Sequence, residues 1–559
     1  MGDHDEYAYQ AANEKFDGQI PVPQTYEDAV NDPVYGPKWR EAIKLELSNL
    51  IRFGTWQYVK RPKDHKVVST KWVFLVKYNA DGRVEQFKAR LVARGFSQRE
   101  GLDFEDTFAP VIRLESLRIL FAIAATYGLV AHLLDATNAY VGSKIDKQIY
   151  MEIPQGVDRQ AHEPGDVCEL LRSLYGLKQS AYLWNQKVKA FVTSTGFKQS
   201  SADPGVFIND RGIIIAVYVD DILVFSKDPK DMDSTKEKLK GFHPMKDSGL
   251  VNKILGIRVT WMKDGSIRLD QEFYARSILE EFGMLDSKPQ QVPLSPSINL
   301  NADDQSRRLT LELHSKFRQI LGRLTYLAGA TRPDIQFSVN RLSQHLAEPR
   351  DVHLQASKHI LRYVRRTMHY GITYTCGAKG SENGGTLVGF SDSSFGNATR
   401  CRSTSAYVFM MAGGPISWSS RKQPITAMST TEAEYVAAAE AAKHAVWIRH
   451  FLFAIRKRNK KPTNLTFKEP TQLGIDNQGA IALASNPVNH LRSKHIHVRY
   501  HAIRDFIEHG EIKTLYVPTT KMIADGLTKA AKPDLIERMV KALRLEGLRR
   551  IDGTDKQGP

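Results

Sequence analysis

The sequence of 559 residues is too long for one ordinary hydrophobic core, so two or more domains are expected. Its 42% hydrophobic and 25% charged residues are typical of a folded globular protein, and its three distant cysteines exclude a disulfide scaffold and a cysteine-based zinc ribbon. The 78 Lys and Arg against 62 Asp and Glu give a net charge of +16. This charge favours a polyphosphate partner such as nucleic acid, although a basic protein that is merely soluble would also fit.

The first part of the chain predicts a helix followed by a hairpin. Residues 1–25 are polar, have the features of neither a signal peptide nor a membrane anchor, and are expected to be disordered. Residues 26–52 predict one amphipathic helix begun by Pro37. Its apolar positions recur at helical spacing: Trp39, Ile43, Leu47 and Leu50. Within residues 55–91, two apolar runs separated by Asn79-Ala80-Asp81-Gly82 predict a β-hairpin.

A buried helix and several strands are predicted next. The apolar stretch at 117–134 approaches the length of a membrane span, but Arg118, Gly128 and His132 interrupt it. It therefore predicts a buried helix around 117–127 and a strand at 130–135. The remaining predicted elements are, in order, two β-rich runs at 212–226, a small sheet at 251–270 with a turn at Asp264-Gly265, a Pro- and Ser-rich linker at 288–301, a mostly helical region at 310–370 and a β-rich unit from about 386 that contains a helix at 430–455.

Two adjacent carboxylates, Asp220 and Asp221, lie in the middle of an apolar hairpin. Their burial is costly unless something compensates, and a divalent metal is the obvious compensation. The alternative is an exposed turn, where Asp is common. Two-metal phosphoryl transfer needs a further carboxylate, for which Asp135 at the end of a strand is the candidate. Taken alone, an Asp in that position is more often a helix cap.

The combination is more specific than its parts. Asp135, Tyr140 and Tyr218-Val219-Asp220-Asp221, in this order, resemble the palm of a reverse transcriptase. The resemblance implies that Asp135, Asp220 and Asp221 are catalytic metal ligands and that Tyr140 is the steric gate against a ribose 2′-hydroxyl. The segments KWVFLVKYNADGRVEQFKARLVARGF, IYMEIPQG, SLYGLKQSAYLW and VYVDDILVFS resemble, nearly word for word, the copia-type LTR retrotransposons.

The same resemblance implies nucleotide- and nucleic-acid-binding residues. Lys88 and Arg90 would belong to the fingers and meet the incoming triphosphate, although exposed strand cations are an equally good interpretation. Tyr218 belongs to the metal-binding motif. Gly176 would allow a close backbone approach to template and nucleotide, whereas the alternative is a plain helix start. Leu255-Gly256-Ile257 resembles the primer-grip hairpin, and its apolar residues can equally be core.

Four more carboxylates, Asp392, Glu434, Asp476 and Asp525, are spread over alternating β and α segments. Each alone would be a surface or capping residue, but their order is the ribonuclease H pattern, in which catalytic carboxylates hold two metals and activate a water. GFSDSSFG, ADGLTK and TRPDIQFSVNRLSQHLAEP resemble the RNase H domain and the preceding connection of copia-type elements. The resemblance covers about residues 26–535.

Some features depart from the family pattern. The segment SDSSFGNATRCRST lacks an Asp and a Trp that are usual nearby, and the loop at 516–521 has no histidine, which leaves the proton shuttle in doubt. A cluster of histidines is interpreted as packed or phosphate-contacting in preference to a zinc site: His490, His495, His497 and His501. The sequence also has no Asp-Thr-Gly protease motif, integrase zinc module or zinc knuckle, so the C-terminal part of a polyprotein is expected, or a gene model of a decayed copy.

The expected fold is an α+β right-hand polymerase with fingers, palm and thumb, followed by a helical connection and an α/β RNase H-like domain. The expected divisions are 1–25 disordered, 26–287 reverse transcriptase, 288–385 linker and connection, 386–540 RNase H-like and 541–559 tail. The expected activities are RNA- and DNA-templated DNA synthesis and cleavage of RNA in hybrids; a decayed or domesticated remnant that binds nucleic acid without catalysis is the alternative. An RNA-dependent RNA polymerase is disfavoured, because it needs neither Tyr140 nor an RNase H unit.

The resemblance also implies cofactors and partners. Each active site would take two Mg²⁺, with Mn²⁺ as a substitute. The partners would be the RNA template, the DNA primer, the RNA–DNA hybrid, dNTPs and other products of the polyprotein, with no membrane. The family implies a cytoplasmic virus-like particle, with the nucleus as an alternative location.

Overall fold

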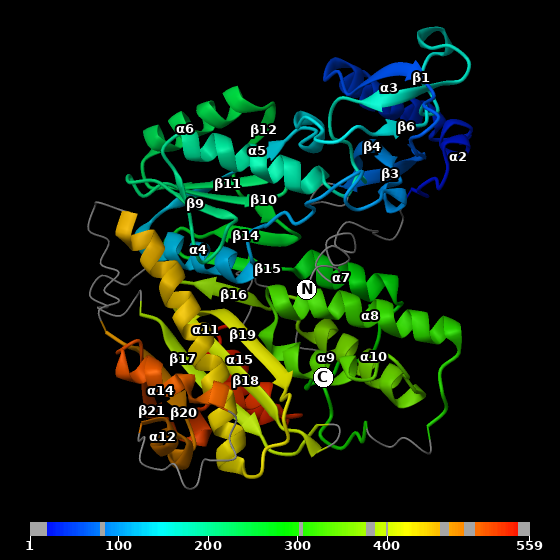
Figure 1. The fold of residues 1–559 in the computed structure, drawn as a ribbon. Coiled ribbons are helices and arrows are strands. Elements are labelled where there is room, and N and C mark those ends of the chain that lie inside the picture. The colour runs from blue at the N-terminus through cyan, green and yellow to red at the C-terminus, as the bar shows by residue number, and fades with distance from the viewer. Residues whose placement is uncertain are drawn as a thin grey trace. The chain divides into compact units, whose positions relative to one another are not determined.

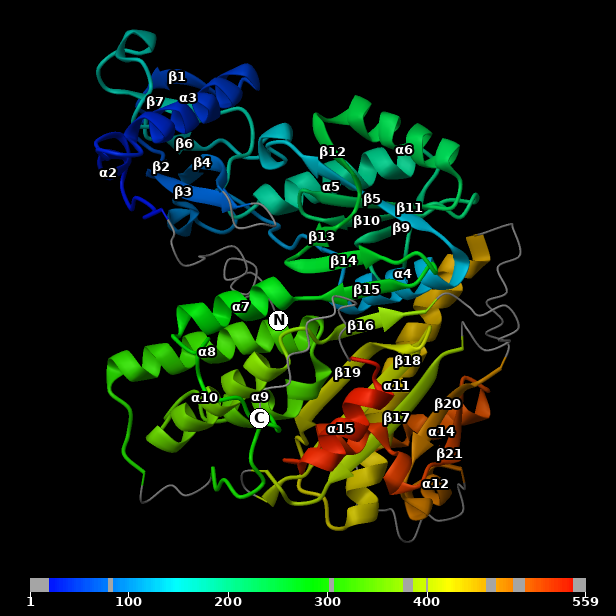
Figure 2. The ribbon, with the colours of Figure 1, turned by 180° about the vertical axis from the view of Figure 1, so that it is seen from behind.

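The computed structural model describes residues 20–78, 84–300, 306–375, 386–398, 401–458, 469–485 and 498–545. They form two compact units (Figures 1 and 2). The first, here called the N-terminal unit, contains Gly18–Ile112 and His132–Gly249. The second, the C-terminal unit, contains Arg113–Ala131 and the chain from Leu250 onward. Within the described residues, no helix is both long and apolar enough to span a membrane.

The N-terminal unit begins with two helices, α2 (Tyr26–Val30) and α3 (Gly36–Arg52). The sequence predicted one helix here, and the difference arises at Asp32. Its Oδ1 accepts from the backbone N–H groups of Val34 and Tyr35 at 2.8 and 2.6 Å, and this turn ends the first helix before Pro37 enters the first turn of the second. The predicted disorder at 1–25 also does not extend to its last residues, because Ile20 and Val22 lie against the core.

Helix α3 turns its predicted apolar face inward, so Trp39, Ile43, Leu47 and Leu50 are all buried. It covers the predicted hairpin, β3 (Thr70–Tyr78) and β4 (Val84–Ala93), whose turn lies outside the described residues. The Trp39 ring centroid lies 5.3 Å from that of Phe74 and 4.7 Å from that of Phe87. A four-stranded sheet lies beside them in the order β1 (Trp56–Lys60), β7 (Asp166–Leu170), β6 (Tyr150–Met151) and β2 (Val67–Val68).

A six-stranded sheet carries the residues of the first candidate site. Its order is β12 (Met245–Leu250), β5 (Val130–Ala136), β11 (Asp221–Ser226), β10 (Ile214–Tyr218), β9 (Val206–Ile208) and β8 (Lys198–Gln199). The predicted strands at 130–135 and 212–226 are thereby confirmed. Two helices, α5 (Ser180–Ser194) and α6 (Pro229–Phe242), accompany this sheet (Figure 1).

The C-terminal unit contains α4 (Leu114–Tyr127) and a sheet of four strands, β13 (Lys253–Ile254), β14 (Ile257–Trp261), β15 (Ile267–Asp270) and β16 (Gly371–Tyr374). The predicted buried helix, small sheet and helical region are confirmed, the last as α8 (Leu311–Ala330), α9 (Gln336–Ser343) and α10 (Asp351–Arg366), preceded by α7 (Glu272–Glu281). The predicted linker has no helix or strand in its described residues, 288–300, yet it is packed, because Val292, Leu294 and Leu300 are buried.

A five-stranded sheet carries the second candidate site, in the order β19 (Gly414–Lys422), β18 (Thr404–Met411), β17 (Val388–Ser394), β20 (Thr471–Ile475) and β21 (Ile512–Tyr516). The first three strands are antiparallel, and β20 and β21 continue in parallel with β17. Figures 1 and 2 show α11 (Thr430–Arg458) on one face and α15 (Pro533–Ala542) on the other. Of the predicted tail at 541–559 the structure describes residues 541–545, where Leu543 and Leu545 are buried.

Candidate active sites

The turn between β10 and β11 presents two of the predicted carboxylates. Tyr218 pairs with Asp221 across the hairpin, so Val219 and Asp220 form the turn. Val219 has a φ of +55°, a left-handed conformation that is costly for a β-branched residue. The Trp184 indole N–H donates to the Val219 carbonyl at 2.7 Å and holds the turn in place. The strained turn thus fixes Asp220 at the tip of the hairpin and Asp221 at the start of β11.

Asp135 reaches the same place from the neighbouring strand. The backbone N–H of Ala136 donates to the Asp220 carbonyl at 2.8 Å, which sets Asp135 beside the turn. Burial, together with the charges of Asp220 and Asp135, raises the pKa of Asp221 to about 7, and burial likewise raises the pKa of Asp220. Two buried carboxylates with raised pKa values, next to the charge of Asp135, are a suitable donor set for a divalent cation. Among the described residues they do not form as close a group as the second site does.

The two predicted cations of the fingers face these carboxylates. The Arg90 Nη2 lies 4.0 Å from the Asp220 Oδ2. Burial and the charges of Arg90 and Lys77 lower the pKa of Lys88 to about 8, opposed by Asp135 and Asp220. Behind them, buried Glu46 of α3 accepts from the Leu91 N–H at 3.4 Å, and burial raises its pKa. Nothing in the sequence singled out Glu46, because an acid on an amphipathic helix gives no sign of being buried.

Tyr140 is held by an aromatic neighbour that the sequence reasoning did not select. Its ring meets the Tyr175 ring edge to face at 5.0 Å, and the Arg90 guanidinium carbon lies 4.8 Å from the centroid of the Tyr175 ring. Gly176 does not start a helix, since α5 begins at Ser180. It has a φ of +88°, and a Cβ there would lie 2.1 Å from the Ala93 carbonyl oxygen. The close approach that this glycine permits is therefore one to strand β4 of its own chain.

The second site lies at the carboxyl ends of two parallel strands. Asp392 is in β17 and Asp476 follows β20, which pairs in parallel with β17, so both reach the same edge of the sheet. Helix α11 brings Glu434. One ligand atom from each of these three carboxylates lies within 4.8 Å of the others. The structure thus brings together three of the four predicted carboxylates in a compact group.

Hydroxyl groups orient these carboxylates. Thr528 donates to the Asp392 Oδ2 at 2.7 Å, Thr519 donates to the Asp476 Oδ2 at 2.8 Å, and the backbone N–H and hydroxyl of Ser393 donate to the Glu434 Oε1 at 3.0 and 2.9 Å. The Glu434 Oε2 is buried without a hydrogen-bond partner in the described part of the chain. Burial and then the charge of Asp392 raise the pKa of Glu434, and burial raises the pKa of Asp392. An orphaned carboxylate oxygen in a group of three acids, two of them buried, fits a divalent cation.

Asp525 lies near this group of three carboxylates but is not one of its members. It lies in the 3₁₀ helix Ile523–Leu527, and its Oδ1 is 2.6 Å from the Lys529 Nζ. Its charge still contributes to the raised pKa of Asp392. Thr528 and Lys529 were not selected as site residues, although both belong to the quoted segment ADGLTK. Of the four clustered histidines only His501 lies within the described residues, where its Nδ1 is 2.9 Å from the Tyr435 hydroxyl.

Comparisons with known proteins identify the family of this chain. Residues 53–296 match the family described as reverse transcriptase (RNA-dependent DNA polymerase). The chain is 36% identical over 513 residues to the retrovirus-related Pol polyprotein from transposon RE1 of Arabidopsis thaliana, over 91% of this chain and 33% of that protein. It is 34% identical over 526 residues to the polyprotein from transposon TNT 1-94 of Nicotiana tabacum, over 92% of this chain and 38% of that protein.

A shorter relative is covered almost entirely. The putative transposon Ty5-1 protein YCL074W of Saccharomyces cerevisiae is 33% identical over 312 residues, which are 55% of this chain and 98% of that protein. Among solved structures, a foamy viral protease-reverse transcriptase in complex with RNA/DNA hybrid aligns with 86% of this chain and 54% of that chain, at 13% identity and a TM-score of 0.46.

The matched segment defines a reverse transcriptase domain at residues 53–296. Within that class the chain belongs to the Pol polyproteins of copia-type retrotransposons, which confirms the resemblance seen in the sequence. It spans about a third of the length of the two plant polyproteins.

Proposed function

We propose that the chain copies an RNA or DNA template into DNA at the first site and cleaves the RNA strand of an RNA–DNA hybrid at the second. The observation that supports this most is the presence of two separate sets of carboxylates, one in each compact unit, in which burial and neighbouring charges raise the pKa of Asp221 and of Glu434. All seven predicted carboxylates are present, which favours an enzyme over a remnant that only binds nucleic acid.

At the polymerase site, Asp135, Asp220 and Asp221 would hold two Mg²⁺ ions, or Mn²⁺ in their place. Metal bound there supplies activation of the primer 3′-hydroxyl and stabilisation of the leaving pyrophosphate. Arg90 and Lys88 would bind the triphosphate, since both already face the carboxylates. The Tyr140 ring would occupy the space that a 2′-hydroxyl needs. Tyr218 would act as part of the metal-binding motif, and Gly176 would allow a close backbone approach to template and nucleotide.

At the hydrolase site, Asp392, Glu434, Asp476 and Asp525 would hold the metal that activates water for cleavage of the RNA strand. The strand order, with three antiparallel strands followed by two parallel ones, supports an RNase H-like domain at 386–540. Thr528 orients Asp392 and Ser393 orients Glu434. The absence of a histidine at 516–521 leaves Thr519 as the described side chain that contacts Asp476 from this loop.

We assign residues 26–287 to the fingers, palm and thumb of the reverse transcriptase, 288–385 to the linker and connection, and 541–559 to the tail. The proposed partners are an RNA template, a DNA primer, the hybrid that they form, dNTPs and other products of the polyprotein. The proposed setting is a cytoplasmic virus-like particle, or alternatively the nucleus, as the resemblance to copia-type elements implies.

Primer extension tests the proposal. Purified protein is supplied with a DNA primer on an RNA template, dNTPs and Mg²⁺, and a variant with Asp220→Asn serves as the control. Incorporation well above the control is expected. If well-folded protein incorporates no more than the variant, the polymerase assignment is lost and the nucleic-acid-binding remnant is the better description.

A further inference from the structure

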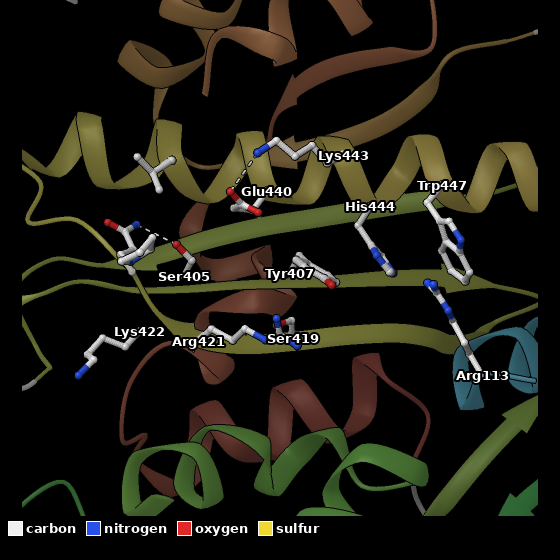
Figure 3. Close-up of a pocket in the computed structure, with 13 residues that line it drawn as sticks. Arg113, Ser405, Tyr407, Ser419, Arg421, Lys422, Glu440, Lys443, His444 and Trp447 are labelled. Atoms are coloured by element: carbon white, nitrogen blue, oxygen red, sulfur yellow. Dashed lines mark hydrogen bonds and ion pairs between the residues drawn. The ribbon is translucent and has the colours of Figure 1, made fainter. Parts of the chain in front are cut away.

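A cavity of about 550 Å³ opens between α11 and strands β18 and β19 of the C-terminal unit (Figure 3). Four cationic side chains line it: Arg113, Arg421, Lys422 and Lys443. Its one carboxylate among the described residues is Glu440, whose Oε1 lies 3.2 Å from the Lys443 Nζ. The lining therefore carries an excess of positive charge, which suits an anionic ligand.

This cavity is separate from the hydrolase carboxylates, none of which line it. Gln423 forms a wall on that side. Its amide nitrogen donates to the Ser405 hydroxyl at 2.8 Å and to the Ala433 carbonyl at 2.9 Å. Glu434, the next residue of α11, instead accepts hydrogen bonds from Ser393 of β17. A ligand in the cavity would thus lie on the other side of Gln423 from the carboxylates.

The cations form a row and do not converge on one point. Figure 3 shows Lys422 and Arg421 toward one end of the cavity and Arg113 at the other, with Lys443 on α11 between them. The seven-residue step from Glu440 to Trp447 along α11 covers roughly 10 Å at 1.5 Å per residue. Each strand of a double helix carries a charge about every 3.4 Å of helix axis, and an unpaired strand is more extended, so at most two or three phosphates would match this row.

The wall beside the row is aromatic and rigid. The Tyr407 and His444 rings stack at 4.9 Å, His444 and Trp447 stack at 5.2 Å, and the Arg113 guanidinium carbon lies 5.1 Å from the Trp447 ring centroid. These rings are stacked on one another, so much of each ring face is already covered. The wall therefore offers an apolar surface to the sugars and few free ring faces on which bases could stack. The volume is that of a small-molecule site, too small to enclose a duplex. Positive grooves of this kind track the backbone of a single strand.

We propose that this cavity binds two or three nucleotides of single-stranded nucleic acid through their phosphates, apart from both carboxylate sites. The cations hold the backbone, and the aromatic wall and the hydroxyls of Ser405 and Ser419 line its path. The site would recognise the negative charge and the single-stranded state of its ligand, and it would not discriminate between the bases. It would retain a strand that is not paired in the duplex.

The test measures binding of a fluorescein-labelled eight-nucleotide RNA to the full chain at several salt concentrations. The variant carries Arg421→Gln and Lys443→Gln, and a matched control carries Lys513→Gln and Lys541→Gln, two exposed lysines of the same unit that do not line the cavity. The variant is expected to bind about 10-fold more weakly, with a salt slope reduced by about 1.4, because each phosphate contact contributes about 0.7 on single strands. Arg421→Lys with Lys443→Arg should restore binding.

A crosslinking experiment distinguishes binding in this cavity from binding at the proposed polymerase site. An eight-nucleotide RNA containing 4-thiouridine should crosslink to peptides from residues 405–447, and cleavage of a blunt hybrid should be unchanged in the variant. The proposal is overturned if the variant keeps its affinity and salt slope, if crosslinks fall only elsewhere, or if inorganic phosphate competes as well as the oligonucleotide does. Loss of hybrid cleavage in a folded variant would also overturn it, since the cavity would then belong to the hybrid's path. Absence of primer extension bears on the proposed function alone.

Discussion

At the scale of single residues, Tyr140 of the proposed polymerase site lies against Tyr175, which is placed between Tyr140 and Arg90. Tyr140 meets Tyr175 edge to face, and Arg90 covers Tyr175 while it approaches Asp220. Replacing Tyr140 by Ala would open the space beside the incoming sugar, so ribonucleotides should be used at least 10-fold better relative to dNTPs. The measurement is the ratio of kcat/KM for the two substrates. Tyr140→Phe keeps the ring and should keep the discrimination; an unchanged ratio in the Ala variant would mean that Tyr140 only packs.

A second prediction concerns the hydroxyl that orients Asp392. Thr528 donates to the Asp392 Oδ2 at 2.7 Å, and an outer hydrogen bond of this kind typically contributes about 10- to 100-fold to metal affinity. Thr528→Val keeps the shape and removes the donor. The Mg²⁺ concentration for half-maximal RNA cleavage should therefore rise by about 10-fold or more, while Thr528→Ser stays near the wild-type value. Equal Mg²⁺ requirements in all three proteins would leave Thr528 with a purely structural role.

At the scale of elements, Gly176 joins the end of β4 to the segment before α5. The Ala93 N–H donates to the Tyr175 carbonyl at 2.8 Å, and the two backbones are too close for a Cβ on Gly176. Gly176→Ala should therefore lower the free energy of unfolding by about 3 kcal/mol, since overpacking adds to the left-handed strain. Gly196→Ala is the matched control: its φ is +92° with no atom within 4 Å of a Cβ, so strain alone should cost about 1 kcal/mol.

Urea unfolding of the two variants decides between the two interpretations of this glycine. If Gly176→Ala costs no more than Gly196→Ala yet weakens template binding, the glycine serves the nucleic acid and not the fold.

Elements with a strong local pattern were predicted well from the sequence. The hairpin around Asp220-Asp221 and the buried helix α4 follow from continuous apolar runs, and the long helix α11 contains an Ala-rich segment. The predicted helix at 26–52 was divided because the Asp32 side chain satisfies two backbone N–H groups, which periodicity does not register. Strand β16 pairs with β15, which lies about a hundred residues earlier in the sequence, and no local sequence pattern predicts that pairing.

The prediction of site residues from the sequence has the same limit, because contacts between distant residues leave no local pattern. Motif order selected the carboxylates, whereas Tyr175, Glu46 and Thr528 act through contacts with residues distant in sequence. None of these three residues can be recognised as part of a site from the sequence unless the residue that it contacts is known.

At the scale of the whole molecule, the compact units are not two successive stretches of sequence. Helix α4 belongs to the C-terminal unit, and Arg118 explains why. The sequence marked this residue as an interruption of an apolar stretch. In the fold it is buried, and its guanidinium donates to the carbonyls of Ile416, Gly329 and Ala330 at 2.7, 2.7 and 3.0 Å and lies over Trp418. An element from the first quarter of the chain is therefore built into the unit that carries the proposed hydrolase carboxylates.

This interleaving makes point substitution, and not truncation, the right way to separate the two activities. Asp221 belongs to the N-terminal unit and Glu434 to the C-terminal unit, and the two carboxylate sets share no residue. Glu434→Gln keeps the side-chain shape and the hydrogen bond from Ser393 while removing one negative charge, so RNA cleavage should fall by more than 100-fold with primer extension largely intact. Asp221→Asn should do the reverse. Distant sites without shared partners act additively, so the double variant should show both losses and no more.

Both assays are run on all three variants, with hybrid binding as the control for folding. If Glu434→Gln also destroys extension in protein that still binds the hybrid, the units act as one cooperative machine. If it leaves cleavage unaltered, Glu434 is not a metal ligand, and the buried, unpartnered Oε2 would need another explanation.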